Sequence, residues 1–480
     1  MYVLALAAAI VYILNGFDGG LTRDLAIYSY GAQKVVDGVP PYLGILNRAG
    51  PLAHLIPAIG VVGARLAGFE DVLGIRLLFM LFAIGSVGVT FVLGRELFES
   101  RLAGLAASTA LLSFQGFITY ATTGPREKTL MVFFLLCCLL GFARRKWVAA
   151  GASISLAALV WQPALLVGLA AFGVTVAALR SGERTLALVR FAVGGLVPAV
   201  LCTIYFAAVG ALREFVDAYL LINARYTIPS PLWGENLATK WAAMQGGYGV
   251  TLWVIVVGLA ALFYLAVVAI RREGWGASAR TSEVVLVSAV LVGLGWSVRD
   301  FNSWPDAFVL LPMAALGVGA VTRELARRLP STAALAVTLT WVVAAVVMAV
   351  TFSVTHQSHG LEKQRRAVEA MLAQLPPGAS ILSIEAAQPL VLSRSTNPTR
   401  YQTFGRGLGN YVDDTWPGGL AGFADWVRQE RPTVISIRSA RSHPWLQETL
   451  DAEYRRKGRA PKWVWFVHRS VASDVTRARR

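Results

Sequence analysis

The stretch from Phe17 to Pro51 holds residue types that can do chemistry. It follows the first apolar run and contains three acids, two arginines and one lysine among tyrosines, glycines and prolines. This mixture is unsuited to a segment that faces lipid, because a charged side chain in the bilayer is costly unless it is used. We therefore expect this stretch to carry functional side chains.

A short amphipathic helix is predicted from about Arg23 to Asp37 within this stretch. Apolar and aromatic side chains recur there at three- and four-residue steps, and Gly38, Pro40 and Pro41 end the pattern. A helix this short and polar is expected to lie along the membrane surface. Asp24 in its first turn faces helix amides that favour the ionised carboxylate, a group able to accept a proton or a cation. The alternative is that Asp24 only starts the helix.

The composition predicts a multi-pass membrane protein. Hydrophobic residues make up 56% of the chain and charged residues 15%, and the mean hydropathy is +0.57. The formal net charge of +16 is dispersed over short loops and the C-terminal part, which indicates topology and attraction to anionic head groups rather than a nucleic-acid partner. The three cysteines lie in apolar runs, so neither a disulfide framework nor a cysteine metal site is predicted.

Eleven membrane spans are predicted from the apolar runs. A further apolar run from Pro51 to Leu66 contains His54 and Pro57 and is interpreted as a second interfacial or re-entrant helix, with a full span as the alternative. The predicted spans are Tyr2 to Gly16, Val72 to Gly94, Leu102 to Tyr120, Thr129 to Phe142, Trp147 to Val160, Pro163 to Leu179, Leu186 to Val209, Val250 to Ile270, Glu283 to Val298, Ala307 to Val321 and Ala333 to Val354.

The distribution of basic residues orients these spans. Arginine and lysine cluster on alternate loops, at Arg144 to Lys146, Arg180 to Arg190, Arg271 to Arg272 and Arg323 to Arg328. By the positive-inside rule those loops and the N-terminus are cytoplasmic. The polar stretches Phe17 to Pro51, Thr122 to Lys128, Trp161 to Gln162, Ala211 to Tyr248 and Arg299 to Asp306, together with the C-terminal domain, are then extracytoplasmic.

The sequence predicts two domains, a transmembrane region over 1–354, which includes the external loop 17–51, and a soluble α/β domain over 355–480. Helices are expected at Leu361 to Gln374, Leu420 to Gln429 and about Pro444 to Tyr454, and strands at Ser380 to Ile384, Thr433 to Ile437 and Trp463 to Val467. The glycine-rich run from Phe404 to Tyr411 could cradle a phosphate. No strand is expected to lead into it and no helix to follow at once, so a surface loop is preferred.

The residues of the first external loop resemble those of a known superfamily. The pattern is Asp24, Tyr28, Ala32, Gly38 and Pro41-Tyr42, followed by Gly50-Pro51-Leu52 at the start of an interfacial helix. It resembles the membrane glycosyltransferases of the GT-C superfamily, particularly those that use polyprenyl- or dolichyl-phosphate sugars, which include the protein O-mannosyltransferase and aminoarabinose transferase relatives.

The resemblance implies transfer of a sugar, with inversion, from a lipid phosphate carrier to a hydroxyl on the external face. It implies that Asp24 is the base, with Asp18 as the runner-up, and that Tyr28 binds substrate beside them. Mannose is the expected sugar and arabinose its competitor. The expected acceptor is a glycan, a lipid or a protein, and the expected surroundings are membrane lipids.

A second polar cluster, TTGPREKT, contains Arg126, Glu127 and Lys128 at a membrane boundary. Arg126 and Lys128 are predicted to hold the lipid phosphate, because arginine binds phosphate oxygens bidentately and lysine acts as a point charge. Glu127 is assigned to the acceptor or to a divalent metal such as Mg²⁺ or Mn²⁺, although the superfamily shows an aspartate at this loop. The alternative is simple anchoring at the interface.

A third cluster, WSVRDFNSWPDAF, includes Arg299, Trp304 and Asp306. We expect these three to bind substrate, with Arg299 completing a phosphate clamp and Trp304 stacking on a sugar. An aromatic belt beside an anchoring arginine is the alternative. Gln162, in the break between two short spans, is expected to line the same cavity, although a polar residue at a helix break is the simpler account.

Two other functional classes remain open. A transporter or lipid flippase would also be polytopic with embedded charges, but such proteins place ionisable groups near the membrane midplane in repeated halves. Here the charges gather on one face, no internal repeat is visible and the chain ends in a soluble domain, so an enzyme is preferred. A non-catalytic assembly subunit with the same fold is the second alternative.

Overall fold

The computed structural model describes residues 2–232, 237–274, 278–279, 281–405 and 407–471. The chain forms two compact units, each built from separate stretches of sequence. The first unit comprises Met1–Phe17, Arg76–Tyr205 and Pro229–Gln357, and the second comprises Asp18–Ile75, Phe206–Ile228 and Ser358–Arg480. The predicted first external loop therefore belongs to the same unit as the C-terminal segment.

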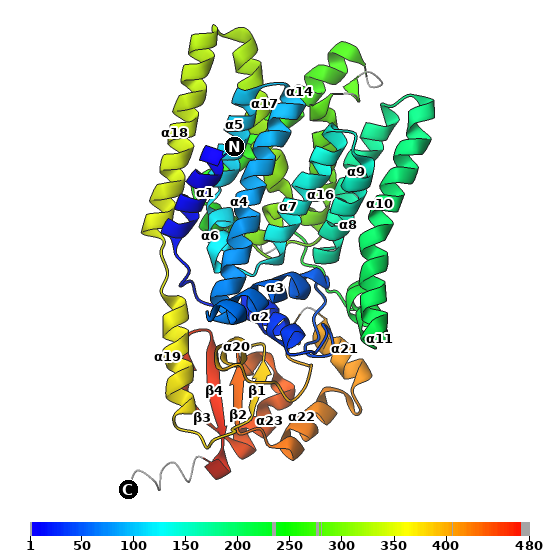
Figure 1. Cartoon of the computed structure of the whole chain (residues 1–480). Helices are drawn as coiled ribbons and strands as arrows, with labels where there is room; N and C mark the ends of the chain where they lie inside the picture. Colours follow the sequence, from blue (N-terminus) through cyan, green and yellow to red (C-terminus); the bar gives the residue numbers. More distant parts are fainter. Residues whose placement is uncertain (1, 233–236, 275–277, 280, 406, 472–480) are drawn as a thin grey trace. The chain divides into compact units, whose positions relative to one another are not determined.

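The first unit is a bundle of apolar helices (Figure 1). Helix α4 begins in the second unit and α10 ends there. The elements of the bundle are α1 Tyr2–Asn15, α4 Asp71–Phe98, α5 Arg101–Ser113, α6 Gln115–Thr123, α7 Glu127–Ala143, α8 Trp147–Val160, α9 Ala164–Ala177, α10 Ser181–Ala208, α13 Leu237–Tyr248, α14 Thr251–Glu273, α16 Ser282–Arg299, η2 Trp304–Leu310, α17 Leu311–Arg328 and α18 Ser331–Thr355.

Six helical segments among the described residues are long and apolar enough to cross a membrane, which agrees with a membrane protein. A seventh results if α5 and α6, which bend by 66° at Phe114, count as one broken span. Helices α1, α8 and α9 contain 14 residues each, fewer than a typical span needs. Nine of the predicted spans fall on one helix each, whereas Leu102 to Tyr120 covers both α5 and α6, and Ala307 to Val321 covers the 3₁₀ turn η2 and α17. The total of eleven stays a prediction.

Close backbone contact joins α14 to α17 in this bundle. A Cβ on Gly317 would overlap the carbonyl oxygen of Gly258, and a Cβ on Gly258 would overlap that of Ala314. Glycine is thus required on both helices at this crossing. In membranes, where apolar helices gain little from leaving lipid for a partner, such close approach provides much of the packing energy.

The second unit combines the two helices that were predicted to be interfacial with a small α/β layer. Its elements are α2 Arg23–Val36, α3 Leu52–Ala67, α11 Leu212–Phe215, the π-helical turn η1 Val216–Leu221, α12 Ile222–Arg225, α19 Gly360–Leu372, β1 Ile381–Ile384, α20 Gln388–Ser393, α21 Leu408–Thr415, α22 Gly419–Glu430, β2 Val434–Ile437, η3 Ala440–Ser442, α23 Pro444–Glu453, β3 Tyr454–Ala460 and β4 Trp463–His468. Both interfacial helices start and end within a few residues of their predicted bounds.

The sheet has the order β1-β2-β4-β3, with β1 and β2 parallel and the other pairs antiparallel. Its strands β1, β2 and β4 were predicted. Strand β3 was not predicted, because its interior from Arg455 to Arg459 is polar, exposed and without apolar alternation. Such a charged strand is well suited to the edge of a sheet, where it discourages pairing with another chain.

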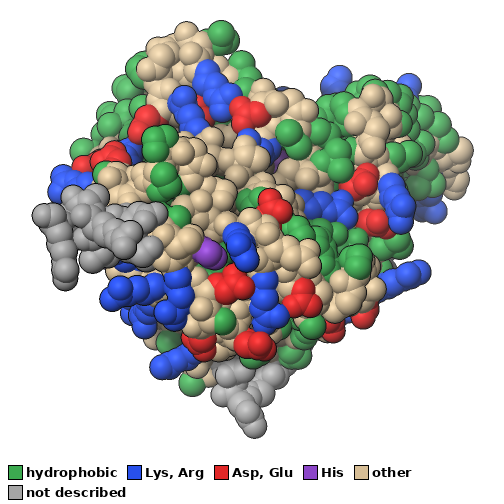
Figure 2. All heavy atoms as spheres, turned by 90° about the horizontal axis from the view of Figure 1, so that it is seen from below, with side chains coloured by type: hydrophobic (Ala, Val, Ile, Leu, Met, Phe, Trp, Pro, Cys, Tyr) green, Lys and Arg blue, Asp and Glu red, His purple; other side chains and the backbone are tan. Residues whose placement is uncertain are grey.

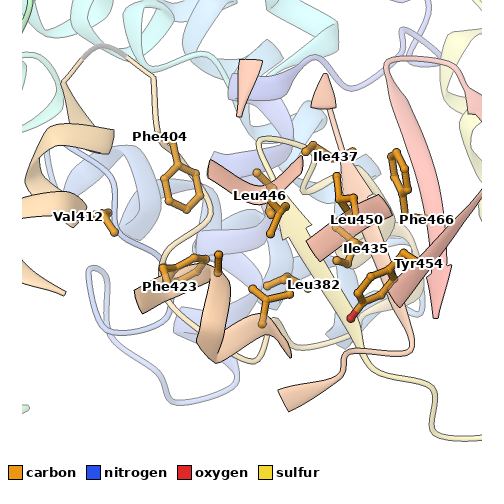
Figure 3. Packing of buried hydrophobic residues seen from close by; sticks show 13 residues of the cluster. Leu382, Phe404, Val412, Phe423, Ile435, Ile437, Leu446, Leu450, Tyr454 and Phe466 are labelled. Carbon is orange, nitrogen blue, oxygen red and sulfur yellow. The ribbon is translucent and has the colours of Figure 1, made fainter. Parts of the chain in front are cut away.

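The core of this layer joins the strands to the helices that cover one side of the sheet. Leu382, Ile435 and Ile437 contact Phe423 of α22 and Leu446 of α23 in one buried cluster (Figure 3). The outer surface differs sharply, since Lys and Arg side chains gather there in groups with acids between them (Figure 2). The predicted α/β character of the C-terminal segment is thus confirmed.

The glycine-rich run differs from its prediction in one respect. Helix α21 begins at Leu408, within the run, so the expectation that no helix follows at once was wrong. Gly407 precedes it with φ of +91°, and a Cβ there would overlap the carbonyl oxygen of Tyr226. Glycine is therefore required to bring these two backbones together. Arg406 lies outside the described residues.

Candidate active site

Asp24 occupies the first turn of α2, as predicted. Thr22, the last residue before α2, has an extended backbone, and the helix begins at Arg23. The Asp24 carboxylate therefore lies at the positive end of the helix dipole. Its Oδ1 accepts a hydrogen bond from Arg23 Nε at 3.1 Å, and 34% of its side chain is exposed. Asp24 is thus an accessible carboxylate beside a guanidinium, in a position that suits a general base.

Arg23 is shared between two carboxylates. Its Nη1 lies 3.6 Å from Oε2 of Glu385, whose side chain is buried, while Nε donates to Asp24. Burial lowers the pKa of Arg23, but the charges of Asp24 and Glu385 raise it more, so the net pKa is raised. Sequence analysis did not single out Arg23 or Glu385, because no local motif links residues so far apart.

The second candidate base, Asp18, is exposed at the start of the same loop. Its carbonyl oxygen accepts a hydrogen bond from Leu361 N at 2.9 Å, which ties the loop backbone to α19. The structure thus places Asp18 in the loop that leads into α2 and Asp24 in the first turn of that helix. It also distinguishes them, since only Asp24 lies within a helix turn and pairs with a cation among the contacts of the described residues.

Tyr28, one turn after Asp24, is buried against α3. Its ring meets the ring of His54 edge-on, with centroids 5.6 Å apart, and Tyr42 approaches the same imidazole at 6.3 Å. A Cβ on Gly31 would overlap Nδ1 of His54, so α2 and α3 are in tight contact here. This packing fixes the orientation of α2 and of the carboxylate at its start.

His54 is fully buried, and in the described part of the chain neither ring nitrogen has a hydrogen-bond partner. Burial lowers the pKa of its imidazole to about 4. This burial predicts a pH-dependent stability, because the folded state binds the proton more weakly than the unfolded state does. The stabilisation is full above the ordinary pKa near 6.5 and is lost as the pH falls towards 4, with a maximum of about 3 kcal/mol.

The measurement is thermal unfolding of the purified protein between pH 7 and pH 4, compared with His54→Gln, which does not titrate in this range. The wild type should lose more stability on acidification than the variant. His443, whose pKa burial also lowers, remains in both proteins and cancels in the comparison. Equal losses in the two proteins would contradict the prediction.

The buried contacts of Asp71 hold α2 and α3 in place. Its carboxylate accepts hydrogen bonds from Gln33 at 2.9 Å, from Arg65 at 3.2 and 3.3 Å and from Arg394 at 3.1 Å. Gln33 lies in α2, Arg65 lies in α3 and Arg394 directly follows α20. A buried charge is tolerated only when it is paired in this way, so Asp71 ties the two interfacial helices to the C-terminal segment.

The second predicted cluster forms the N-terminus of α7 in the first unit. Arg126, Glu127 and Lys128 are all buried, with 8%, 6% and 4% exposure. Lys128 forms an ion pair with Asp306, and Arg126 Nε lies 3.4 Å from Oε2 of Glu127. A buried charge is costly unless it is paired. Each basic side chain of this cluster has an acidic partner, which is consistent with a functional site.

Aromatic rings surround these charges. Trp304 stacks on Tyr120, with centroids 4.9 Å and planes 13° apart, so one of its faces is already covered. The guanidinium of Arg126 lies 5.5 Å from the Tyr120 centroid, and the Lys128 ammonium 5.2 Å from that of Trp161. Cations over aromatic rings are stabilised in addition to their ion pairs.

The remaining predicted residues lie at the edges of this cluster. Arg299 is exposed at the end of α16, with its guanidinium 5.8 Å from the Trp296 ring, and Gln162 is half-buried in the turn between α8 and α9. Asp306 Oδ2 accepts hydrogen bonds from Asn302 N at 2.6 Å and from Ser303 N at 3.4 Å, and the second of these belongs to the capping box at the start of η2. Trp233, in the predicted extracytoplasmic stretch from Ala211 to Tyr248, lies outside the described residues.

The predicted site residues thus fall into two groups. The first unit brings Arg126, Glu127, Lys128, Trp304 and Asp306 together, with Gln162 and Arg299 on neighbouring elements. The second unit holds Asp18, Asp24 and Tyr28. The described residues contain no cluster of three or more His, Cys, Asp and Glu side chains able to hold a metal ion, and the carboxylates of Asp24 and Glu127 both pair with arginines. We derive no step through a metal.

No protein-family model and no curated protein matches the sequence. Solved structures match the fold over almost the whole chain. ArnT from Cupriavidus metallidurans bound to undecaprenyl phosphate gives a TM-score of 0.65 at 15% identity, and the match covers 98% of both chains. The same protein in the apo state gives 0.63 at 14% identity, over 97% of both chains.

The archaeal oligosaccharyltransferase AglB from Archaeoglobus fulgidus, in complex with an inhibitory peptide and a dolichol-phosphate, is also similar. It gives a TM-score of 0.55 at 12% identity, covering 98% of this chain and 74% of AglB. These structures have the fold of GT-C membrane glycosyltransferases. The resemblance seen in the first external loop is therefore confirmed at the level of the fold.

Proposed function

We propose that this chain is an inverting glycosyltransferase that moves a sugar from a polyprenyl-phosphate carrier to an acceptor hydroxyl on the external face of the membrane. The observation that carries the proposal is Asp24, an accessible carboxylate at the start of α2 in a chain with the GT-C fold. The undecaprenyl phosphate of the ArnT structure and the dolichol-phosphate of the AglB structure support a lipid phosphate as the carrier.

In the proposed reaction, Asp24 accepts the proton of the acceptor hydroxyl as the oxygen attacks the anomeric carbon of the sugar. One carbon–oxygen bond forms as the bond between that carbon and the phosphate oxygen breaks, and the lipid phosphate leaves as an anion. A single displacement of this kind inverts the anomeric centre. Arg126 stabilises the phosphate, because a guanidinium offers two parallel donors to its oxygens.

Lys128 plays a smaller electrostatic role in this proposal than the sequence suggested. Its ammonium is already paired with Asp306, so that pair brings little net positive charge to a phosphate. Arg126 is also paired, with Glu127 at 3.4 Å, but its guanidinium has five N–H donors in a fixed fork that matches phosphate oxygens, whereas lysine is a point charge. We therefore assign the main phosphate contact to Arg126 and a structural role to the ion pair between Lys128 and Asp306.

The sugar is proposed to be mannose, with arabinose as the competitor, and the acceptor a glycan, lipid or protein. The alternation of basic loops supports a cytoplasmic N-terminus and an extracytoplasmic C-terminal segment.

The test is transfer from a panel of radiolabelled polyprenyl-phosphate sugars by the purified wild-type protein in detergent, with membrane extract as the source of acceptors. We expect label to move to an acceptor from one donor, which would also identify the sugar. Polyprenyl phosphate that binds the folded protein without transfer from any donor would overturn the proposal and favour a flippase or an assembly subunit.

A further inference from the structure

The loop that leads into α2 is bound along its backbone by the C-terminal segment. Gln364 of α19, which is buried, accepts a hydrogen bond from Leu21 N at 2.7 Å and donates one to Leu21 O at 2.9 Å. Gln388 also donates to Leu21 O, at 3.3 Å. A backbone amide and carbonyl that are both held by one side chain cannot shift without breaking two buried hydrogen bonds.

A second contact, from Glu385, involves Arg23, whose side chain pairs with Asp24. Glu385 follows β1 with a φ of +56°, a left-handed conformation that is uncommon for a residue with a side chain. Its Oε1 accepts hydrogen bonds from Gly405 N at 2.8 Å and Phe404 N at 3.3 Å, and its Oε2 lies 3.6 Å from Arg23. The strained backbone and the two amides together aim this carboxylate at Arg23.

Gly405 allows this arrangement because it has no side chain. A Cβ at this position would lie 3.0 Å from Glu385 Oε1 and 3.4 Å from Arg23 Nη1. A methyl group would therefore displace the Glu385 carboxylate by a few tenths of an ångström and would touch the Arg23 guanidinium. The glycine-rich run, which the proposed reaction did not use, thus has a structural purpose in the contact between Glu385 and Arg23.

We propose that the C-terminal segment is a positioning element for the loop that carries Asp24. Glu385 holds the guanidinium of Arg23, which in turn orients the Asp24 carboxylate, and Gln364 fixes the loop backbone at Leu21. This inference rests on the proposed function, in which Asp24 is the base. It gives the C-terminal segment a role, which neither the sequence pattern nor the proposed reaction provides. Fixing a catalytic group by a supporting shell matters, because a misplacement of about 1 Å can cost 10²-fold in rate.

The main test variant is Glu385→Gln. Glutamine keeps the size of the side chain and an oxygen for the amides of Phe404 and Gly405, but it removes the charge that holds Arg23. We expect kcat to fall roughly 10- to 100-fold with little change in the donor KM. Hydrogen exchange of the backbone amides in 18–25 should become faster. Glu430→Gln, which removes an exposed charge from α22, is the matched control and should behave as the wild type.

A double-mutant cycle tests whether Glu385 acts through Arg23. In an Arg23→Gln background, Glu385→Gln should have little further effect on kcat, because the group that it orients is gone. Additive losses would show that Glu385 acts by another route and would overturn the proposal. Gln364→Met keeps the length of the side chain, removes the two hydrogen bonds between Gln364 and Leu21 and leaves the one from Gln388. It is the second variant for the hydrogen-exchange measurement.

The exchange measurement does not depend on transfer. If exchange in 18–25 is unchanged in both Glu385→Gln and Gln364→Met, the positioning role is wrong, whatever the activity. If exchange rises in both variants but the wild type transfers no sugar from any donor, the proposed function fails and the structural link stands. Faster exchange together with a selective loss of kcat supports both.

Discussion

Asp24→Asn should reduce sugar transfer by about 10²- to 10⁴-fold, the usual contribution of a general base. Asparagine has the same shape as aspartate, and its oxygen can still accept the hydrogen bond that Arg23 Nε donates to Oδ1. The amide cannot take the proton of an acceptor hydroxyl. The loss should therefore appear in the chemical step, measured as single-turnover transfer with saturating donor, while donor binding stays near that of the wild type.

Asp18→Asn is the matched control for this substitution. Asp18 lies on the same loop, but its side chain is exposed and only its backbone carbonyl contacts α19. We expect this variant to retain transfer. If Asp18→Asn abolished transfer and Asp24→Asn left it intact, the base would be Asp18. Circular dichroism of all three proteins would establish that neither substitution acts through the fold.

Arg126→Gln should weaken donor binding, raising the donor KM by about 10- to 100-fold. This is the effect of losing charge-assisted hydrogen bonds, each of which contributes about 1.5–3 kcal/mol. The measurement is KM and kcat across donor concentrations, together with direct binding of polyprenyl phosphate. Arg126→Lys keeps the charge but not the bidentate geometry, so its donor KM should lie between those of the wild type and Arg126→Gln.

Lys128 provides the contrasting case for the same measurement. Its ammonium balances Asp306, so Lys128→Gln leaves a buried carboxylate without its partner and should mainly destabilise the protein. The added change Asp306→Asn should restore much of that stability. An unchanged donor affinity in Arg126→Gln would remove Arg126 from the phosphate site. If Lys128→Gln combined with Asp306→Asn lost more affinity for the donor than Arg126→Gln, Lys128 would be the main phosphate contact.

Local sequence patterns predicted most of the helices and three of the four strands. Helix α2 was predicted from the spacing of its apolar residues and from the glycine and prolines after it, and the observed helix runs from Arg23 to Val36. Strand β3 was missed because an exposed edge strand carries charges instead of an apolar face. Helix α21 was missed because its first turn lies within a glycine-rich run that favours a loop.

The sequence by itself determined which residue types were available for chemistry, because hydropathy and helical periodicity are local properties. It singled out Asp24 at the start of an interfacial helix and the buried charges that begin α7. Only the tertiary structure decided which charges meet. Lys128 and Asp306 are 178 residues apart, and the pairing of Arg23 with Glu385 depends on the left-handed turn after β1 and on the backbone amides of Phe404 and Gly405 that hold the Glu385 carboxylate. Such contacts depend on how separate segments pack, and no periodicity along the chain encodes them.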